Sequence, residues 1–263
     1  VKETKYRINS GDWLTYSGTY TITGSDGLYA IEYYSTDNLG NTEITKSTTV
    51  KLDNTPPVST LTPTGGKQYS SSDGKLYASA DTRYFLEGND PVTNNVASGL
   101  REIKYLLDST PNITYIQPLP LTEGIHTIKY FSVDNLENTE SLKSFAVNVD
   151  SAAPETKIKV GTPAFETAGI TYISSTTEIS FEANDPENLP RQPASGLNYT
   201  EYRIDDGSFI QYTSKFVIPQ EGAHTIEYRS LDNVANTEQT KTFTVYVTHL
   251  QDYALTGAEK ITL

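Results

Sequence analysis

The sequence predicts an all-β protein built from tandem antiparallel β-sandwich modules, the first of which is incomplete. One segment recurs three times, at residues 33–43, 130–140 and 228–238. Its aspartates, Asp37, Asp134 and Asp232, lie 97 and 98 residues apart, a period that indicates domain-sized repeats rather than a solenoid of short ones. Gly and Pro interrupt the chain at short intervals, and long apolar stretches with a helical period are missing, so few helices are expected.

The best-defined strand of each repeat alternates between apolar and polar residues. In the first copy one face carries Tyr29, Ile31, Tyr33 and Ser35. The equivalent face begins at His126 in the second copy and at His224 in the third. This pattern is typical of an antiparallel sheet with one buried face. Flanking strands repeat it at Tyr84–Gly88 and Ile179–Ala183, at Ile103–Leu107 and Thr200–Ile204, and at Phe145–Val149 and Phe243–Val247.

The strand spacing indicates the type of sandwich. About seven short strands are expected for each repeat of roughly 97 residues, with turn signals every 8 to 12 residues, which is typical of an immunoglobulin-like sandwich. Strands end in the proline-containing linkers 52–57 and 149–154. We therefore predict complete modules at 54–150 and 151–248, the C-terminal half of a module at 1–53, and a tail or further segment at 249–263.

The half-module has two interpretations. Its first strand begins near Tyr6-Arg7-Ile8, the equivalent of Tyr202-Arg203-Ile204, so the strands that should precede it are missing. One interpretation is a fragment boundary, which agrees with the absence of Met and of a signal-like segment. The other is completion by β-addition, with residues 253–263 as a donor strand between neighbouring chains. The second interpretation predicts self-association through the incomplete first module.

Composition excludes several classes of function. The net charge of −13 and the pI near 4.6 argue against nucleic-acid binding, which needs a clustered Lys/Arg surface. No apolar run approaches the ~20 residues of a transmembrane segment. Without Cys, disulfides and thiolate chemistry are unavailable to the chain. No unique carboxylate pair, phosphate loop or nucleophile elbow stands outside the repeats, so we expect a protein that is not an enzyme.

The residues also resemble a known repeat. Tyr202-Arg203-Ile204-Asp205-Asp206-Gly207, the segment 221–230, Asp232-Asn233 and the preceding Ser195-Gly196-Leu197 are similar to the repeat of leptospiral outer-membrane surface proteins and other bacterial cell-surface chains. The resemblance covers residues 1–248. It implies extracellular immunoglobulin-like modules on the bacterial cell surface, used as stalks, adhesive arrays or accessories to enzymes, with a host matrix protein or a glycan as partner.

Acidic residues mark a candidate metal site. In such a sandwich the loop after the second strand, the loop between the last two strands and the incoming linker meet at one end of the module. We expect this to gather Asp53, Asp90, Asp134 and Asn135 at one junction, and Asp150, Asp185, Asp232 and Asn233 at the next. Hard oxygen ligands in irregular geometry suit Ca²⁺ better than Mg²⁺. The alternative is that these Asp and Asn residues cap turns, while Glu43, Glu140 and Glu238 merely begin exposed strands.

Three functional hypotheses follow. The first is a non-catalytic stalk or adhesive segment of a bacterial surface protein, rigidified by Ca²⁺ at the module junctions. The second is a carbohydrate-binding or accessory region of a secreted hydrolase, for which Trp13 is the candidate sugar platform; its equivalents Phe209 and Ile113 favour packing instead. The third is a filament subunit joined by strand exchange.

Overall fold

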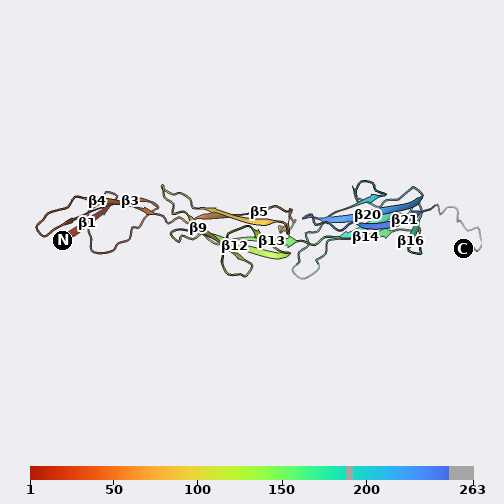
Figure 1. The fold of residues 1–263 in the computed structure, drawn as a ribbon, viewed down its shortest axis with the longest axis horizontal. Helices are drawn as coiled ribbons and strands as arrows, with labels where there is room; N and C mark the ends of the chain where they lie inside the picture. The colour runs from red at the N-terminus through yellow and green to blue at the C-terminus, as the bar shows by residue number, and fades with distance from the viewer. Residues whose placement is uncertain (188–191, 249–263) are drawn as a thin grey trace, which may run out of the picture. The chain divides into compact units, whose positions relative to one another are not determined.

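The chain is all-β, as the sequence predicts. We describe a computed structural model in which residues 1–187 and 192–248 are placed, and these residues form strands and no helix (Figure 1). Within these ranges, therefore, no helix has the length and hydropathy needed to cross a membrane. The predicted donor strand at 253–263 lies outside the described residues.

Contacts divide the chain into two compact units. One comprises residues 1–63, 84–119 and 127–145, and the other comprises residues 64–83, 120–126 and 146 onward. The strands of the second predicted module are thus shared between the units. The predicted module boundaries after residues 53 and 150 stay predictions.

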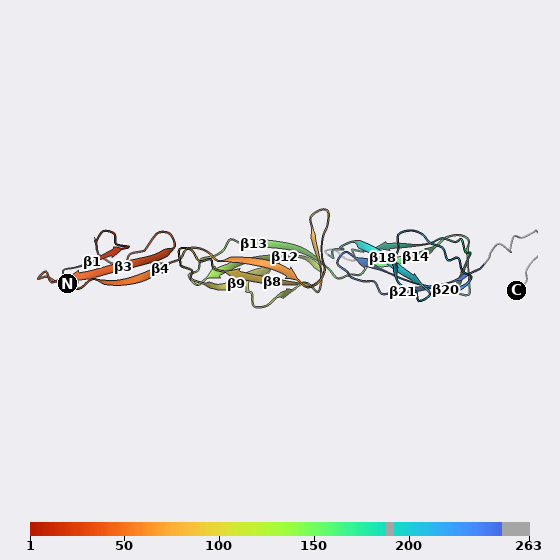
Figure 2. The ribbon, with the colours of Figure 1, turned by 90° about the horizontal axis from the view of Figure 1, so that it is seen from above.

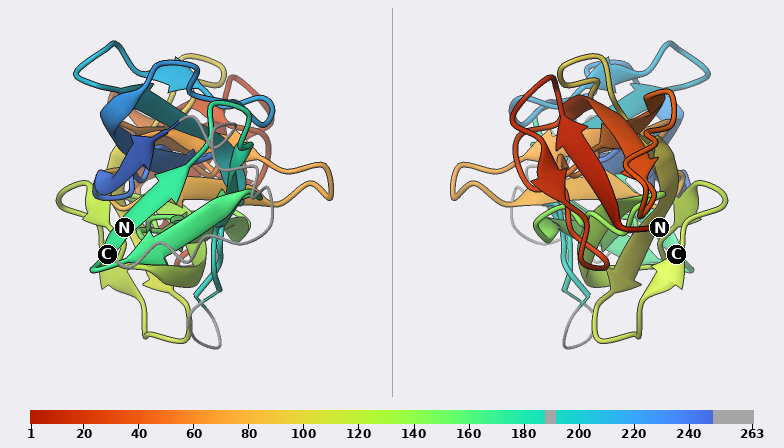
Figure 3. Two further views of the ribbon diagram at one scale, coloured as in Figure 1. Left: turned by 90° about the vertical axis from the view of Figure 1, so that its right-hand side faces the viewer. Right: turned by 90° about the vertical axis from the view of Figure 1, so that its left-hand side faces the viewer.

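The first sheet has four antiparallel strands in the order β2-β1-β3-β4 (Figure 3, right-hand view, red to orange). Tyr6 of β1 lies opposite Tyr33 of β3. Ile31 is the buried residue of β3, and the strand β4 is exposed along nearly its whole length. The strands are β1 (Glu3–Ile8), β2 (Leu14–Thr15), β3 (Gly27–Thr36) and β4 (Lys46–Leu52).

The middle of the chain forms a six-stranded sheet, β10-β9-β12-β13-β7-β6, and a three-stranded sheet, β11-β8-β5 (Figure 2). Strand β9 pairs antiparallel with β10 and β12, and β6 with β7, whereas β7 runs parallel to β13, a pair that alternation alone did not predict. The strands are β5 (Val58–Thr64), β6 (Gln68–Ser70), β7 (Leu76–Ser79), β8 (Arg83–Asn89), β9 (Leu100–Leu107), β10 (Ile113–Thr114), β11 (Leu119–Pro120), β12 (Gly124–Asp134) and β13 (Lys143–Asp150).

The last part repeats this plan with a two-stranded sheet, β14-β17, and a six-stranded sheet, β15-β16-β21-β20-β18-β19. Here β16 runs parallel to β21, the counterpart of the β7–β13 pair. The strands are β14 (Glu155–Val160), β15 (Ala164–Thr167), β16 (Ile170–Ile173), β17 (Ile179–Asn184), β18 (Leu197–Ile204), β19 (Ile210–Gln211), β20 (Gly222–Asp232) and β21 (Lys241–Val247).

The core of this last sandwich confirms the predicted inner faces. Phe181 of β17 packs against Tyr202 of β18 and Tyr228 of β20, and the rings are 5.5 and 4.9 Å apart. Ile226 and Val245 are fully buried between the same sheets. Apolar residues at alternate positions of facing strands thus form one dry layer, the arrangement of an immunoglobulin-like sandwich.

Candidate functional site

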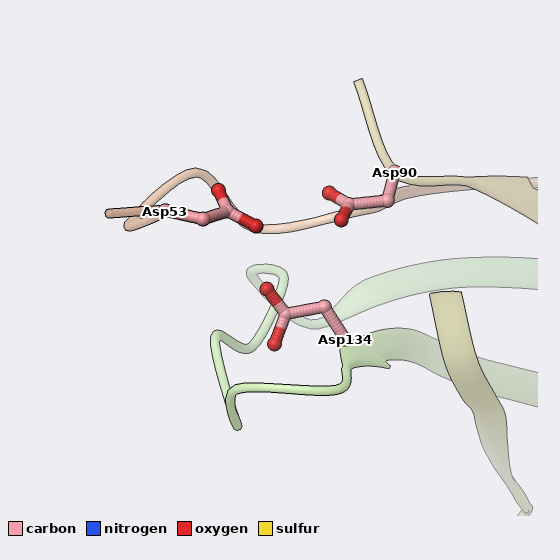
Figure 4. A group of neighbouring side chains, drawn as sticks. All are labelled: Asp53, Asp90 and Asp134. Carbon is pink, nitrogen blue, oxygen red and sulfur yellow. The ribbon is translucent and has the colours of Figure 1, made fainter. Parts of the chain in front are cut away.

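Two clusters of three aspartates form as the sequence predicts. Asp53, Asp90 and Asp134 each place a carboxylate oxygen within 4.8 Å of the others, and their side chains point toward a shared space (Figure 4). Asp150, Asp185 and Asp232 form an equivalent group. Each cluster draws on three distant parts of the chain, because a strand end or linker delivers each residue: β4, β8 and β12 in one case, and β13, β17 and β20 in the other.

The aspartate at the end of the long strand caps a turn. Asp134 Oδ1 accepts the backbone N–H groups of Leu136 and Asn138, both at 2.8 Å, and Oδ2 accepts Asn138 Nδ2 at 2.7 Å. Asp232 does the same with Val234 and Asn236. Turn capping by this residue is therefore confirmed.

The first sheet holds the same turn without the cluster. Asp37 accepts the backbone N–H groups of Leu39 and Asn41 at 2.8 and 2.9 Å, and Asn41 Nδ2 at 2.9 Å. Within the described residues, Asp37 belongs to no cluster of three carboxylates. The turn thus forms without such a cluster, so capping does not explain why two more carboxylates are gathered beside Asp134 and Asp232.

The other two carboxylates hold a glycine loop. Asp53 Oδ2 accepts the N–H of Ser98 at 2.5 Å, and Asp90 Oδ2 accepts the N–H of Gly99 at 2.7 Å. Gly99 has a φ of +90°, a backbone conformation that glycine adopts without steric cost. In the second cluster, Asp150 and Asp185 bind the N–H groups of Ser195 and Gly196 in the same way.

The predicted asparagine ligands contact the same loop. Asn135 Nδ2 donates to the carbonyls of Ser98 and Gly99, both at 2.9 Å, and Asn233 does the same with Ser195 and Gly196. These contacts fix the loop beside the carboxylates, and the role of Asn135 and Asn233 as metal ligands stays a prediction.

The linker is held by its main chain as well. Asn138 Nδ2, which already binds Asp134, also donates to the carbonyl of Asp53 at 3.1 Å. Asn236 donates to the carbonyl of Asp150 at 3.0 Å. One asparagine therefore ties the last turn of a module to the residue that leads into it, and this fixes the position of the linker carboxylate.

Burial makes the clusters electrostatically costly. Asp134, Asp150 and Asp232 are fully buried, and Asp53 is 5% exposed. None of the six carboxylates forms an ion pair with a described residue. Like charges gathered in a region of low dielectric repel one another and favour protonation or a bound cation.

The pKa shifts are largest in the second cluster. Burial, with the negative charges of Asp150 and Asp232, raises the pKa of Asp185 to about 6, although the Gly196 N–H opposes the shift. Burial also raises the pKa of Asp232, against the hydrogen bonds from Asn236. In the first cluster, burial pushes the pKa of Asp134 upward, but the hydrogen bonds from Asn138 and its neighbours outweigh burial and lower it.

Three oxygens at the clusters have no hydrogen-bond partner among the described residues. They are Oδ1 of Asp90, Oδ1 of Asp185 and Oγ of Ser195, all shielded from solvent. Unsatisfied buried acceptors carry a desolvation cost, which a cation would offset. The donor set is all oxygen, which matches the preference of Ca²⁺.

One sequence interpretation is wrong. Glu140 and Glu238 do not begin exposed strands, because their side chains are only 8% and 7% exposed. Glu238 accepts the N–H groups of Thr156 and Ser230 at 2.8 and 3.1 Å, and pairs with Lys241 at 2.6 Å. Alternation missed this because each glutamate directly follows an isolated bridge residue, Thr139 or Thr237, and lies outside the regular strands. The available signal was the recurrence of a glutamate three residues before Lys46, Lys143 and Lys241.

The candidate sugar platform packs within its own sheet. The guanidinium of Arg7 lies 4.7 Å from the centre of the Trp13 ring, and Tyr34 meets the same ring edge-on at 4.6 Å. Phe209 takes the equivalent place under Arg203 at 4.9 Å. These contacts favour the packing role that the alignment of Trp13 with Phe209 predicts.

No protein-family model matches the chain, and no curated protein matches it. Three solved structures resemble it at low identity. Fibronectin(III)-like modules of Clostridium thermocellum CbhA give a TM-score of 0.35 at 11% identity, over 77% of this chain and 100% of that one. The chicken CNTN1 FN1-FN3 domains give 0.28 at 9%, over 93% and 91%. A tetra-tandem repeat in the extending region of a large adhesion protein gives 0.27 at 17%, over 93% and 66%.

Proposed function

We propose that the chain is a non-catalytic, extracellular stalk or adhesive segment of a bacterial surface protein, built from immunoglobulin-like modules that bind Ca²⁺ where each linker enters a module. The observation that carries this proposal is the pair of aspartate clusters, each of which joins a linker carboxylate to two loop carboxylates. A cation in this position would fix the linker against the loops and so stiffen the chain.

The repetition of the cluster supports a structural role. A catalytic centre is usually single, whereas these residues recur at equivalent places one repeat apart. The turn around Asp37 supports the presence of a cation, because the same turn forms there without extra carboxylates. The unpartnered Oδ1 atoms of Asp90 and Asp185 are the acceptors that Ca²⁺ would satisfy.

The surface location and the partner rest on the sequence. The motifs at 195–197, 202–207 and 221–233 are similar to the leptospiral type of surface repeat, and the acidic net charge suits an extracellular, cation-rich setting. The partner proposed for such an array is a host matrix protein or a glycan. The packing of Trp13 under Arg7 does not favour the alternative of a carbohydrate-binding accessory region.

Calorimetry of the whole chain tests the cation. We expect Ca²⁺ to raise the melting temperature and EDTA to lower it. Extracellular modules bind Ca²⁺ with dissociation constants of about 10⁻⁴ to 10⁻³ M. At a free concentration about 100 times the constant, binding stabilises a site by about 2.7 kcal/mol. Mg²⁺ should have a smaller effect, because it requires near-octahedral geometry.

A matched pair of variants makes the test specific. Asp90→Asn removes a cluster carboxylate, whereas Asp37→Asn changes the aspartate that caps the equivalent of the Asp134 turn outside any three-carboxylate cluster. The Asp90 variant should lose the part of the Ca²⁺ gain that belongs to its module, and the Asp37 variant should keep the full gain. An unchanged melting temperature with both Ca²⁺ and EDTA would refute the cation proposal.

A further inference from the structure

The first sheet has an aromatic face that the described structure leaves without a second sheet. Strands β1 and β3 turn Tyr6, Ile31 and Tyr33 to this face, and the segment after β2 adds Tyr16 and Tyr20. Tyr33 is 36% exposed and Tyr16 is 46% exposed. Large aromatic side chains gathered on one face at such exposure indicate an interaction surface.

The last sandwich shows the same face covered. Tyr202 and Phe216 stack there at 4.3 Å and 16°, and Tyr6 and Tyr20 stack in the first sheet at 4.2 Å and 16°. Tyr228, the equivalent of Tyr33, is only 7% exposed. The aromatic residues are thus preassembled in the first sheet in the geometry that the covered sandwich uses.

The covering strand places one ring inside this aromatic group. Phe181 of β17 lies 5.1 Å from Tyr212, 5.8 Å from Phe216 and 4.9 Å from Tyr228. The first sheet has an apolar cavity of about 220 Å³ at the corresponding place. Its lining consists of Thr4, Tyr6, Tyr16, Tyr20, Ile31 and Tyr33, and we call it the aromatic socket. The socket therefore has the lining that surrounds Phe181.

A second feature matches the backbone of a strand. In the last sandwich, Glu238 accepts the N–H of Thr156 on β14 at 2.8 Å, and Lys241 Nζ donates to the carbonyl of Thr156 at 2.7 Å. Glu140 and Lys143 hold the N–H and the carbonyl of Ser59 on β5 in the same way, at 3.0 and 2.5 Å. A Glu-Lys pair thus clamps one residue of the opening strand of a module.

The first sheet carries this clamp without a strand in it. Glu43 accepts the N–H of Ser35 at 2.9 Å, as Glu238 accepts that of Ser230 at 3.1 Å. Lys46 pairs with Glu43 at 2.7 Å, as Lys241 pairs with Glu238, but Lys46 and Glu43 are 57% and 35% exposed, against 38% and 7% for Lys241 and Glu238. The hydroxyl of Ser35 binds Thr4 at 2.9 Å, whereas that of Ser230 binds both Thr200 and Thr156.

The outer edge of β4 is a third point of contact. Its equivalent, β21, pairs in parallel with β16 through Thr171, Tyr172 and Ile173. In the first sheet β4 is the last strand, with β3 on its other side. An exposed sheet edge is a template for an added strand.

We propose that this surface docks the opening half of a further repeat: a segment with an aromatic residue in the socket, a Ser or Thr in the Glu43–Lys46 clamp, and a strand along β4. The chemistry is therefore β-addition combined with one aromatic anchor. Such anchors in a preformed pocket dominate the affinity of an interface.

A synthetic peptide of residues 154–184 tests the proposal, because it carries the strand pair, Phe181 and Thr156 together. The ¹⁵N-labelled full chain is titrated with the peptide in EDTA, so that the result does not depend on the cation. We expect saturable shifts confined to the first sheet. Phe181→Ala or Thr156→Pro in the peptide should each weaken binding about tenfold or more, and Lys157→Ser, at an exposed position, should change it little.

Adjacent residues of β3 supply the controls in the protein. Tyr33→Ser alters the socket, whereas Tyr34→Ser alters the other face, where Tyr34 packs on Trp13. Binding should fall only with Tyr33→Ser, and Glu43→Gln should weaken it without disturbing the sheet. The proposal is overturned by an absence of saturable binding, or by equal affinity of the Phe181→Ala peptide. The proposal would also be overturned if the chain self-associates and Tyr33→Ser abolishes that self-association. The socket would then bind the same surface of a second copy of the chain.

Discussion

Replacing Asp185 with asparagine is expected to change stability in opposite directions with and without Ca²⁺. Without the cation, the ionised Asp185 carboxylate is partly buried beside Asp150 and Asp232, which raises its pKa to about 6. Asparagine has the same shape and no charge. Its Oδ1 can keep the hydrogen bond from the Gly196 N–H, and its Nδ2 can donate to a neighbouring carboxylate.

The raised pKa of Asp185 gives the magnitude and the sign of the expected change in stability. A rise from 3.8 to about 6 corresponds to roughly 3 kcal/mol if solvent does not screen the charge. Asp185 is partly exposed, so we expect about 1 to 1.5 kcal/mol. The contribution of this group to stability is greatest below its unfolded pKa and is lost as the pH rises through about 6. At neutral pH Asp185→Asn should therefore stabilise the cation-free module, and raise its melting temperature by about 5 to 10 °C.

Differential scanning calorimetry measures the change in melting temperature both in EDTA and in Ca²⁺. In EDTA near pH 7 the variant should melt above the unmodified chain, and this advantage should vanish near pH 4. In Ca²⁺ the order should reverse, because the variant lacks one ligand charge. Glu182→Gln, an exposed change on the same strand, should stay within about 0.5 kcal/mol throughout. A variant that is destabilised in EDTA at neutral pH would refute the argument that repulsion and burial dominate at this cluster.

Two further predictions concern stability alone. Glu238→Gln should destabilise the last sandwich by about 1.5 to 3 kcal/mol, because it weakens the charge-assisted hydrogen bonds that the buried Glu238 carboxylate accepts from Thr156 and Lys241. Urea unfolding measures this loss, and a loss below about 0.5 kcal/mol would contradict the clamp. Gly66→Ala should destabilise more than Gly74→Ala, although both glycines have positive φ. A Cβ at Gly66 would lie 2.4 Å from Thr82 Oγ1, whereas none of the described atoms lies within 4 Å at Gly74. Equal melting temperatures for the two variants would exclude the steric explanation.

Alternation along the strands was enough to predict the core. Tyr202, Ile226 and Val245 fall on the predicted inner faces, because one-sided burial imposes a period of two on the sequence. The parallel pair β16–β21 could not be predicted in this way, since the same alternation serves parallel and antiparallel neighbours. Pair direction depends on the path of the connecting chain, which local patterns do not encode.

The acidic clusters were predictable because the repeat supplies the alignment. Three aspartates at loop ends recur with the module period, and the fold brings those loops to one end. The buried role of Glu140 and Glu238 was not predicted, because a lone Glu after a turn is usually exposed. Only the position of the opposing strand shows that each glutamate meets a backbone N–H. The repeated glutamate was thus visible in the sequence, but the strand residue whose N–H it accepts was not.

The position of Asp53 and Asp150 affects how such a gene grows by duplication. Each aspartate closes the last strand of one module or follows it directly, yet its carboxylate holds the glycine loop of the next. A copied segment that begins at residue 54 or 151 would leave this aspartate behind, whereas one that begins at residue 53 or 150 would carry it along. With the predicted module boundaries, each cluster therefore takes one aspartate from the residue directly before its module, so a duplicated copy has a complete cluster only where an aspartate precedes it.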